Sequence, residues 1–416
     1  MNCFLSAFIV AIVFRQTKAR CGTYIAGNTI FTFFWCLILA LSSFGLYGLY
    51  APNLYVYVIS YASVIVFNIP TLSSRNKNCF LLAKNDINGD FSFPMLLIGH
   101  AISYYFALPY LRKSIEFIMK NGFSAIRGVE LEFIGQSTYI ALGFQWICLP
   151  FFTVTIIFSA INIALGRKSS MLFLLAILDT FAYVILYGGR YIILKFLFYV
   201  FAALIIVNGG KVWKIVRKQK KVILFGVITV LFLMYLTSLR SLSHMDFLGN
   251  IVGYYVGSLS LLTQLVEQNV QGDYLGYGHM TFGFIINLFQ AAAKLLLGWE
   301  YNGSDTIFTS FAGDYFQIGE NIKTNALPTF LYALILDYGK YFFFIGVLLL
   351  ASFSFSIEKN FYKKPTIRNF AIYLFILYNI FDTILVYDYI SPGTFVVFIL
   401  LIFLTKDPDN FKSNKL

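Results

Sequence analysis

Charged residues are scarce in this chain of 416 residues, where Asp, Glu, Lys and Arg together make up 12%. Hydrophobic residues make up 59%, and the mean hydropathy is +0.75. Soluble globular domains carry about 25% charged and about 45–50% apolar residues, so this composition excludes an ordinary soluble domain. The Walker A, GxSxG, HExxH and CxxC motifs are also missing. ATP hydrolysis, serine hydrolysis and zinc chemistry therefore have no support.

Cysteine is also rare, with five residues in the whole chain. They are Cys3, Cys21, Cys36, Cys79 and Cys148. Their spacing follows neither a disulfide framework nor a metal-ligand pattern, so we expect no disulfide and no metal. The apolar N-terminus lacks a basic n-region and a small-residue cleavage site, which predicts a membrane span there instead of a signal peptide.

The sequence consists mainly of long apolar runs. Runs of about 20 apolar residues are typical of transmembrane helices. The chain is therefore predicted to be an all-α polytopic integral membrane protein with about 11 transmembrane helices, forming a single domain over residues 1–416. The predicted spans are 3–14, 24–48, 54–70, 92–110, 138–165, 171–187, 191–208, 222–239, 330–356, 370–388 and 393–405.

The formal net charge of +12 would suggest a nucleic-acid partner in a soluble protein. Here most Lys and Arg residues lie in alternate connectors between apolar runs, so the positive-inside rule explains the charge more simply. This asymmetry predicts an N-terminus outside, a cytoplasmic C-terminus and no nucleic acid. The connector at 111–136, the Gly188-Gly189-Arg190 turn and the long stretch at 240–328 then share the outer side.

The stretch at 240–328 is acidic on balance and rich in aromatic residues. Loops beyond about 15 residues are usually functional or disordered, and this one is too aromatic to be disordered. We interpret it as a large periplasmic or extracellular loop that forms the working part of a membrane enzyme. Within it, 247–267 and 280–298 are apolar enough to lie in the membrane interface or to dip into the membrane. The second is predicted to be an amphipathic helix with Gln290 and Lys294 on its polar face, and Leu288, Ala292 and Leu295 opposite.

Two arginines on the outer side are candidates for binding phosphate. Arg190 follows Gly188 and Gly189, which let a ligand approach the backbone closely, and Arg240 stands at the start of the loop. A guanidinium group suits bidentate phosphate recognition, which favours a clamp on a pyrophosphate. The alternative is that both side chains anchor the protein at lipid headgroups.

Candidate proton acceptors lie in the same loop. His244, Asp246 and His279 are on the predicted outer side and are general-base candidates, although each fits a solvated or packed polar residue equally well. Tyr254 and Tyr255 fit either a sugar-stacking surface or an aromatic belt. Two further ionisable residues, His100 and Asp179, lie inside predicted spans, where isolated charges more often serve helix packing.

At this point the chain resembles the Wzy-type oligosaccharide repeat-unit polymerases, which are relatives of the O-antigen ligases. The resemblance rests on the span pattern with one late outer loop, on Gly188-Gly189-Arg190 and Arg240, and on the run from Tyr254 to Leu259. A further stretch from Asn325 through Asp337 to Gly339 resembles a family motif at the start of a span. The resemblance implies a GT-C-like helical fold without metal or cofactor, in the bacterial cytoplasmic (inner) membrane.

The resemblance also implies polymerisation of undecaprenyl-pyrophosphate-linked oligosaccharides, with a chain-length regulator, a flippase and membrane lipids as partners. Arg190 and Arg240 would serve the pyrophosphate, with His244, Asp246 and His279 beside them. The expected substrate-binding residues are Gly188, Gly189, Arg127, Tyr254, Tyr255, Asn325 and Asp337. An O-antigen ligase and a lipid-linked oligosaccharide flippase are the alternatives.

Overall fold

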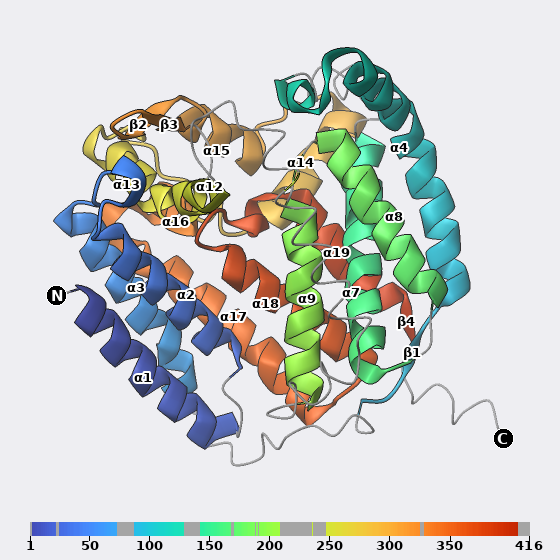
Figure 1. Cartoon of the computed structure of the whole chain (residues 1–416), viewed down its shortest axis with the longest axis horizontal. Coiled ribbons are helices and arrows are strands. Elements are labelled where there is room, and N and C mark those ends of the chain that lie inside the picture. The colour runs from blue at the N-terminus through green and yellow to red at the C-terminus, as the bar shows by residue number, and fades with distance from the viewer. Residues whose placement is uncertain are drawn as a thin grey trace. The chain divides into compact units, whose positions relative to one another are not determined.

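The computed structural model describes most of the chain as helix (Figure 1). The described residues are 2–21, 25–72, 87–128, 142–167, 170–187, 189, 191–208, 235, 247–324 and 328–406. The chain divides into two compact units. Unit 1 comprises Met1–Phe80, Leu248–Lys359 and Asn379–Phe395, and unit 2 comprises Leu81–Phe247, Asn360–Tyr378 and Val396–Leu416. The single polytopic domain predicted above stays a prediction.

Among the described residues, five helical segments are long and apolar enough to cross a membrane. They are Leu54–Leu72, Phe144–Leu165, Ser170–Tyr187, Tyr191–Asn208 and Phe344–Lys363. Three shorter helices, Gly27–Ser42, Gly283–Leu297 and Pro392–Phe403, are also apolar. A mostly helical membrane protein is therefore supported, whereas the count of about 11 spans stays a prediction. The span predicted at 222–239 lies outside the described residues.

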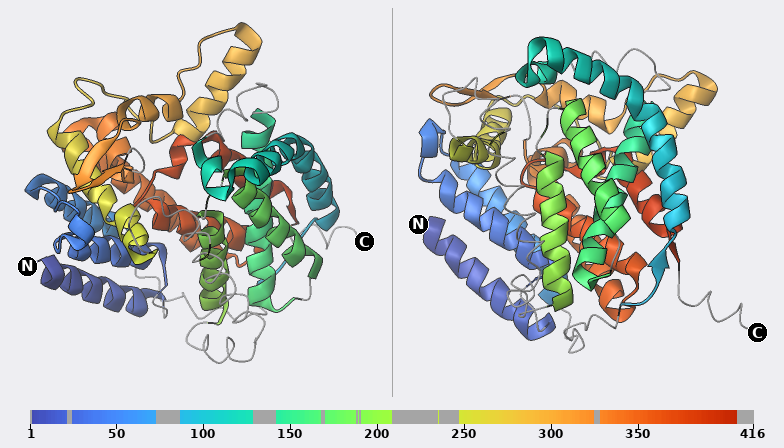
Figure 2. Two further views of the ribbon diagram at one scale, coloured as in Figure 1. Left: turned by 45° about the horizontal axis from the view of Figure 1, so that its top comes forward. Right: turned by 45° about the vertical axis from the view of Figure 1, so that its right-hand side comes forward.

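In unit 1, three N-terminal helices run side by side: α1 (Asn2–Cys21), α2 (Gly27–Ser42) and α3 (Leu54–Leu72) (Figures 1 and 2). Buried amides tie them together. Asn28 Nδ2 donates to Thr17 Oγ1 at 3.0 Å and to Asn68 Oδ1 at 3.1 Å, and Asn68 Nδ2 donates to Thr32 Oγ1 at 2.9 Å. Because each group has its partner, these polar residues can be buried between apolar helices at little cost.

The aromatic core of unit 1 joins the N-terminal helices to α16 (Phe330–Phe342). The Phe31 ring stacks on Phe67 with centroids 4.0 Å apart and meets Phe330 edge-on at 5.8 Å. Trp35 Nε1 donates to Thr383 Oγ1 at 3.0 Å. The first helix is fastened to α17 (Phe344–Lys363) by an ion pair of 2.9 Å between Arg20 and the buried Glu358.

The long loop is folded over residues 247–324. It contains α12 (Phe247–Tyr255), α13 (Gly257–Glu267), α14 (Gly283–Leu297) and α15 (Ser304–Ala312). Strands β2 (Phe316–Gly319) and β3 (Ile322–Thr324) then form an antiparallel hairpin with a register shift. The helix expected within 280–298 is therefore present, and the apolar stretch at 247–267 forms two helices that meet near Val256.

Unit 2 is built around α7 (Leu149–Leu165), which packs against α8 (Ser170–Tyr187) and α9 (Tyr191–Asn208). The π-helical turn η4 (Phe144–Cys148) precedes α7, and α4 (Phe93–Asn121) packs on both. Tyr110, Phe144, Cys148 and Phe152 form a buried cluster there. The short helix η3 (Phe123–Gly128) follows α4.

The remaining elements lie towards the C-terminus. Strand β1 (Asp90–Phe91) pairs antiparallel with β4 (Thr405–Lys406) in unit 2. Helices α18 (Ile367–Asp382) and α19 (Pro392–Phe403) bracket the one-turn helix η6 (Asp388–Ile390). Like α17, both contribute residues to each unit.

Several predicted boundaries differ from the structure, and two of them have a clear physical reason. The span expected at 330–356 is two helices, because Gly339 has a left-handed φ of 75° with ψ of 173°, which breaks the helix before α17 begins. The span expected to end near 110 continues as α4 to Asn121. There Arg112 and Glu116 form an exposed ion pair one helical turn apart at 2.9 Å, and such pairs support a helix outside an apolar run.

Candidate functional site

Asp337 is the anchor of the candidate site in unit 1. It lies in α16 and its side chain is fully buried. Oδ1 accepts a hydrogen bond from the backbone N–H of Met280 at 2.8 Å. Oδ2 accepts from the backbone N–H and from the hydroxyl of Thr281, both at 2.6 Å. Three donors therefore compensate the buried carboxylate and hold the 276–281 segment against the helix.

The backbone of that segment follows α16 closely. Gly276 N–H donates to the Leu336 carbonyl at 2.8 Å, and Tyr277 N–H donates to the Asp337 carbonyl at 3.0 Å. A Cβ added to Gly276 would lie 2.5 Å from Asp337 Oδ1, so only glycine fits there. Tyr277 has a positive φ of 49° although 84% of its surface is exposed. Such a conformation is uncommon for a bulky residue and is typical of functional loops.

His279 lies within this segment, and both of its ring nitrogens have polar partners. Nδ1 lies 3.1 Å from the Ser304 hydroxyl, whose own proton goes to the His279 carbonyl at 2.6 Å. Nδ1 must then be the donor, because the serine hydrogen is already used. Nε2 lies 3.2 Å from the side-chain nitrogen of Gln290, which donates to it. The imidazole is therefore neutral with a basic lone pair on Nε2.

The electrostatics of the site agree with this assignment. Partial burial lowers the pKa of His279 from its usual value, and the nearby Asp337 carboxylate opposes the change without reversing it. The neutral form is accordingly favoured at pH 7. A neutral imidazole whose acceptor nitrogen is held only by an exchangeable amide donor is the state that a general base requires.

Helices α14 and α15 position His279 through Asn287 and Ser304. Asn287 of α14 accepts from the backbone N–H of Ser304 at 2.7 Å and donates to the Ile390 carbonyl at 2.6 Å. Ser304 is fully buried, with its hydroxyl proton committed to a carbonyl. It therefore orients His279 and is not a nucleophile.

The outward face of α14 is apolar. The predicted helix is present, but its buried stripe consists of Gly283, Asn287 and Ala291. Gln290 turns inward to His279 while Lys294 is exposed, so the two do not share an environment as predicted. The large exposed side chains near its C-terminal end are Phe289, Leu295, Leu296, Leu297 and Trp299. Such a face suits headgroup or acyl-chain depth in a membrane.

Several predicted site residues lie outside the described residues: Gly188, Arg190, Arg240, His244, Asp246 and Asn325. The side chain of Arg127, at the end of η3, is also not described. Of the rest, His279 and Asp337 come together in unit 1, whereas Gly189 belongs to unit 2. In α12, the Tyr255 ring packs 6.2 Å from Phe381 and is half-buried, which fits core packing better than an exposed sugar platform.

A second polar cluster lies among the apolar helices of unit 2. His100 Nε2 of α4 is 2.8 Å from Asp179 Oδ2 of α8, and both side chains are buried. The Tyr104 hydroxyl donates to Asp179 Oδ1 at 3.1 Å. His100 Nδ1 is 3.0 Å from the Leu96 carbonyl, and Nε2 is also 3.2 Å from Thr155 Oγ1. The two residues expected to be isolated are therefore a pair.

The partners of this pair fix its protonation. The Leu96 carbonyl can only accept, so His100 Nδ1 carries hydrogen. The 2.8 Å contact between His100 Nε2 and Asp179 Oδ2 then shares one further proton, so the pair is net-neutral. The charge of Lys195 in α9 is stabilised by an aromatic ring, because its ammonium lies 4.9 Å from the centre of the Tyr378 ring.

Three residues of the unit 1 site were not predicted: Thr281, Asn287 and Ser304. A signal for one of them was present, because Ser304 follows Gly303 and precedes Asp305 at the start of a helix. No protein-family model or curated protein matches the sequence, and no solved structure matches the fold.

Proposed function

We propose that this protein is a membrane-embedded, metal-independent glycosyltransferase that polymerises undecaprenyl-pyrophosphate-linked oligosaccharide repeat units on the outer face of the bacterial cytoplasmic membrane. The long apolar helices support an integral membrane protein. The resemblance of Gly188-Gly189-Arg190 and of the 325–339 stretch to Wzy-type polymerases supports the choice of reaction. In this proposal the chain has about 11 spans in a GT-C-like arrangement.

The observation that carries the proposal is the neutral His279, which Ser304 orients within the segment that Asp337 anchors, a few residues before α14 and its apolar outward face. A lipid-linked sugar has its acyl part in the bilayer and its reacting hydroxyl just outside it. A proton acceptor at the foot of an interfacial helix matches that geometry. Gln290 occupies Nε2 until a sugar hydroxyl replaces it as the donor.

The proposed chemistry needs one base and one charge-stabilising site. The acceptor hydroxyl oxygen bonds to the anomeric carbon of the donor while the bond from that carbon to the pyrophosphate oxygen breaks. The electron pair leaves with undecaprenyl pyrophosphate, and the hydroxyl proton passes to His279 Nε2 and then to water. Since pyrophosphate is a good leaving group, the main requirement is to hold two lipids in register and stabilise the departing charge.

In this proposal Arg190 and Arg240 supply that charge stabilisation. Their guanidinium groups can contact a pyrophosphate in a bidentate manner, which a lysine ammonium cannot reproduce. His244 and Asp246 remain alternative proton acceptors, because they follow Arg240 closely in the sequence.

A transporter of lipid-linked oligosaccharides is the second candidate. The observation that favours it is the buried His100–Asp179 pair, since ionisable groups within apolar helices often bind protons during transport. The two candidates differ in their product: a polymerase makes longer glycans, whereas a transporter moves unchanged ones.

The deciding experiment is reconstitution of the full chain in liposomes with undecaprenyl-pyrophosphate-linked repeat units, followed by gel separation of the glycans. Wild-type protein should give a ladder. Arg190→Ala and Arg240→Ala should give single units only, the corresponding Lys variants should rescue poorly, and His279→Ala should shorten the ladder.

Arg112→Ala is the matched control, because Arg112 is an exposed arginine of α4 that pairs with the exposed Glu116. It should leave the ladder intact. A wild-type protein that moves the lipid-linked unit across the bilayer without extending it would favour the transporter. Unimpaired ladders in both arginine variants would remove the clamp from the mechanism.

A further inference from the structure

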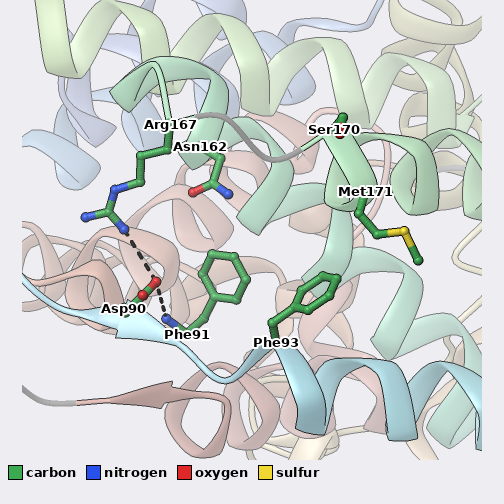
Figure 3. Close-up of a pocket in the computed structure, with 7 residues that line it drawn as sticks. All are labelled: Asp90, Phe91, Phe93, Asn162, Arg167, Ser170 and Met171. Carbon is green, nitrogen blue, oxygen red and sulfur yellow. Dashed lines mark hydrogen bonds and ion pairs between the residues drawn. The ribbon is translucent and has the colours of Figure 1, made fainter.

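A pocket of about 550 Å³ lies in unit 2, between the start of α4, the C-terminal end of α7 and the N-terminal end of α8 (Figure 3). It is lined by Asp90, Phe91, Phe93, Asn162, Arg167, Ser170 and Met171. Its volume is within the range of small-molecule sites, which is roughly 300–1,000 Å³. None of these residues takes part in the function proposed above.

Asn162 is the polar group that most needs a ligand. Only 5% of its surface is exposed, and its Oδ1 has no hydrogen-bond partner among the described residues. Figure 3 shows the amide above the ring of Phe91, on the pocket side of α7. A buried acceptor without a donor is costly, so a ligand that brings an N–H group would recover a missing hydrogen bond.

Arg167 and Asp90 provide opposite charges in the same pocket, and their contact is loose. Arg167 Nη1 lies 3.5 Å from Asp90 Oδ1, and Nη2 lies 3.3 Å from the Gly89 carbonyl. Both side chains are substantially exposed. Exposed pairs of this length contribute little, so each charge is available to a group of the opposite sign.

The rest of the pocket wall is apolar, and Phe91 is held in place by its packing and its strand pairing. The Phe91 ring stacks on Phe158 with centroids 5.0 Å apart and planes 10° from parallel. Its backbone pairs with Thr405 in the β1–β4 ribbon. Phe93 and the half-exposed Met171 complete this side. A ligand that fits this wall has an apolar part next to a zwitterionic head.

We propose that this pocket binds the headgroup of an ethanolamine phospholipid. The primary ammonium donates to Asn162 Oδ1 and pairs with Asp90, while the phosphate pairs with Arg167 and accepts from the Ser170 hydroxyl. The acyl chains begin along Phe93 and Met171. A choline headgroup carries the same charges but has no N–H donor, so it leaves Asn162 Oδ1 unsatisfied. The site should therefore distinguish the two lipids.

The test uses the purified full chain in a non-ionic detergent, with bound lipids counted by native mass spectrometry. Phosphatidylethanolamine and phosphatidylcholine with identical acyl chains are compared. The ethanolamine lipid should bind at least about five-fold more tightly, as expected for one extra satisfied hydrogen bond. Asn162→Leu should abolish this preference while choline-lipid binding remains.

Arg167→Gln should weaken the binding of both lipids, and Arg112→Gln, the exposed-arginine control, should change neither. Because Arg167 and Ser170 are exposed, Arg167→Gln and Ser170→Ala test the site even when Asn162→Leu does not fold. Soluble phosphoethanolamine should compete better than inorganic phosphate. Equal binding of the two lipids by the wild type, or equal competition by inorganic phosphate, would overturn the proposal.

Discussion

The two units each bury an aspartate completely, and they compensate it in different ways. Asp337 in unit 1 is held by two backbone N–H groups and one hydroxyl, and no counter-charge bonds to it within the described part of the chain. Asp179 in unit 2 is held by the side chains of His100 and Tyr104, the first of which can titrate. The first arrangement fixes the path of a loop. The second joins two helices and depends on a proton.

This difference determines which changes can be compensated. The backbone N–H donors remain after any substitution of Asp337. Only a side chain that also accepts hydrogen bonds can therefore replace it. A side-chain ion pair can be replaced as a whole, because two well-packed apolar residues often substitute for both charges. The following predictions rank the consequences.

Removing Asp337 should have the largest effect. Asp337→Ala leaves three donors unsatisfied, each costing about 1–3 kcal/mol, so we expect a loss of about 4 kcal/mol in unfolding free energy together with loss of activity. Denaturant unfolding of the protein in detergent measures this. Asp273→Ala is the control, because Asp273 is an exposed aspartate of the same loop. A stable Asp337→Ala protein with normal activity would contradict the anchoring role.

Breaking the unit 2 pair should rank second. Asp179→Leu leaves His100 without its carboxylate and should cost about 3 kcal/mol. The double variant His100→Leu/Asp179→Leu should recover most of that loss, because no buried charge then remains. The same unfolding assay compares the three proteins. If the double variant is as unstable as the single one, the pair is not the source of the cost.

Replacing the proposed base comes next. His279→Ala should reduce polymerisation about 10²-fold, equivalent to about 2.7 kcal/mol, which is at the low end for a positioned base. Since the pKa of His279 is lowered in the folded state, wild-type activity should be constant around pH 7 and fall only well on the acid side. Asp337→Asn removes the charge that raises this pKa, so its acid limb should move to lower pH. An unchanged pH profile in both variants would exclude His279 as the base.

The same pKa shift affects stability with a definite sign. At a pH between the folded-state pKa and the unfolded value of 6.5, the unfolded chain binds a proton at His279 that the folded chain does not. Stability is therefore lost as pH falls from 6.5 through the folded pKa, and it is regained as pH rises. His279→Gln should remove this contribution to the pH dependence of unfolding.

Deleting a single hydroxyl donor should have the smallest effect. Tyr104→Phe removes one hydrogen bond from Asp179, and Thr281→Val removes one from Asp337. Each should cost about 1–2 kcal/mol, because the carboxylate keeps its other partners. Thermal unfolding of the two variants measures whether the loss of one hydroxyl donor lowers stability equally at Asp179 and at Asp337. A loss as large as that of Asp337→Ala in either protein would show that the hydroxyl, and not the whole set of donors, holds the carboxylate.

Much of the helical architecture follows from the sequence. The predicted spans at 54–70 and 191–208 coincide closely with α3 and α9, because uninterrupted apolar runs between polar connectors allow few alternatives. The break at Gly339 was not predicted. A glycine within an apolar run is compatible with a continuous helix, and only its positive φ shows the interruption.

The candidate site was predictable only in part. His279 and Asp337 were both singled out, yet in separate roles, because the bonded residues Met280 and Asp337 are 57 positions apart and only the fold joins them. His100 and Asp179 are 79 positions apart and were judged isolated for the same reason. Sequence patterns identify unusual residues well, whereas long-range partners depend on how helices pack.

The ion pair between Arg20 and Glu358 has a consequence for biosynthesis. Its two residues are separated by 338 positions, so α1 leaves the ribosome long before α17 has been made. Most of unit 2 is synthesised in that interval, because its largest segment lies between the first two segments of unit 1. Helices α7–α9 of unit 2 can thus pack together first, whereas α1 stays without its α17 partner until synthesis passes residue 358. A chain arrested before residue 358 would hold a largely complete second unit and an unfinished first one.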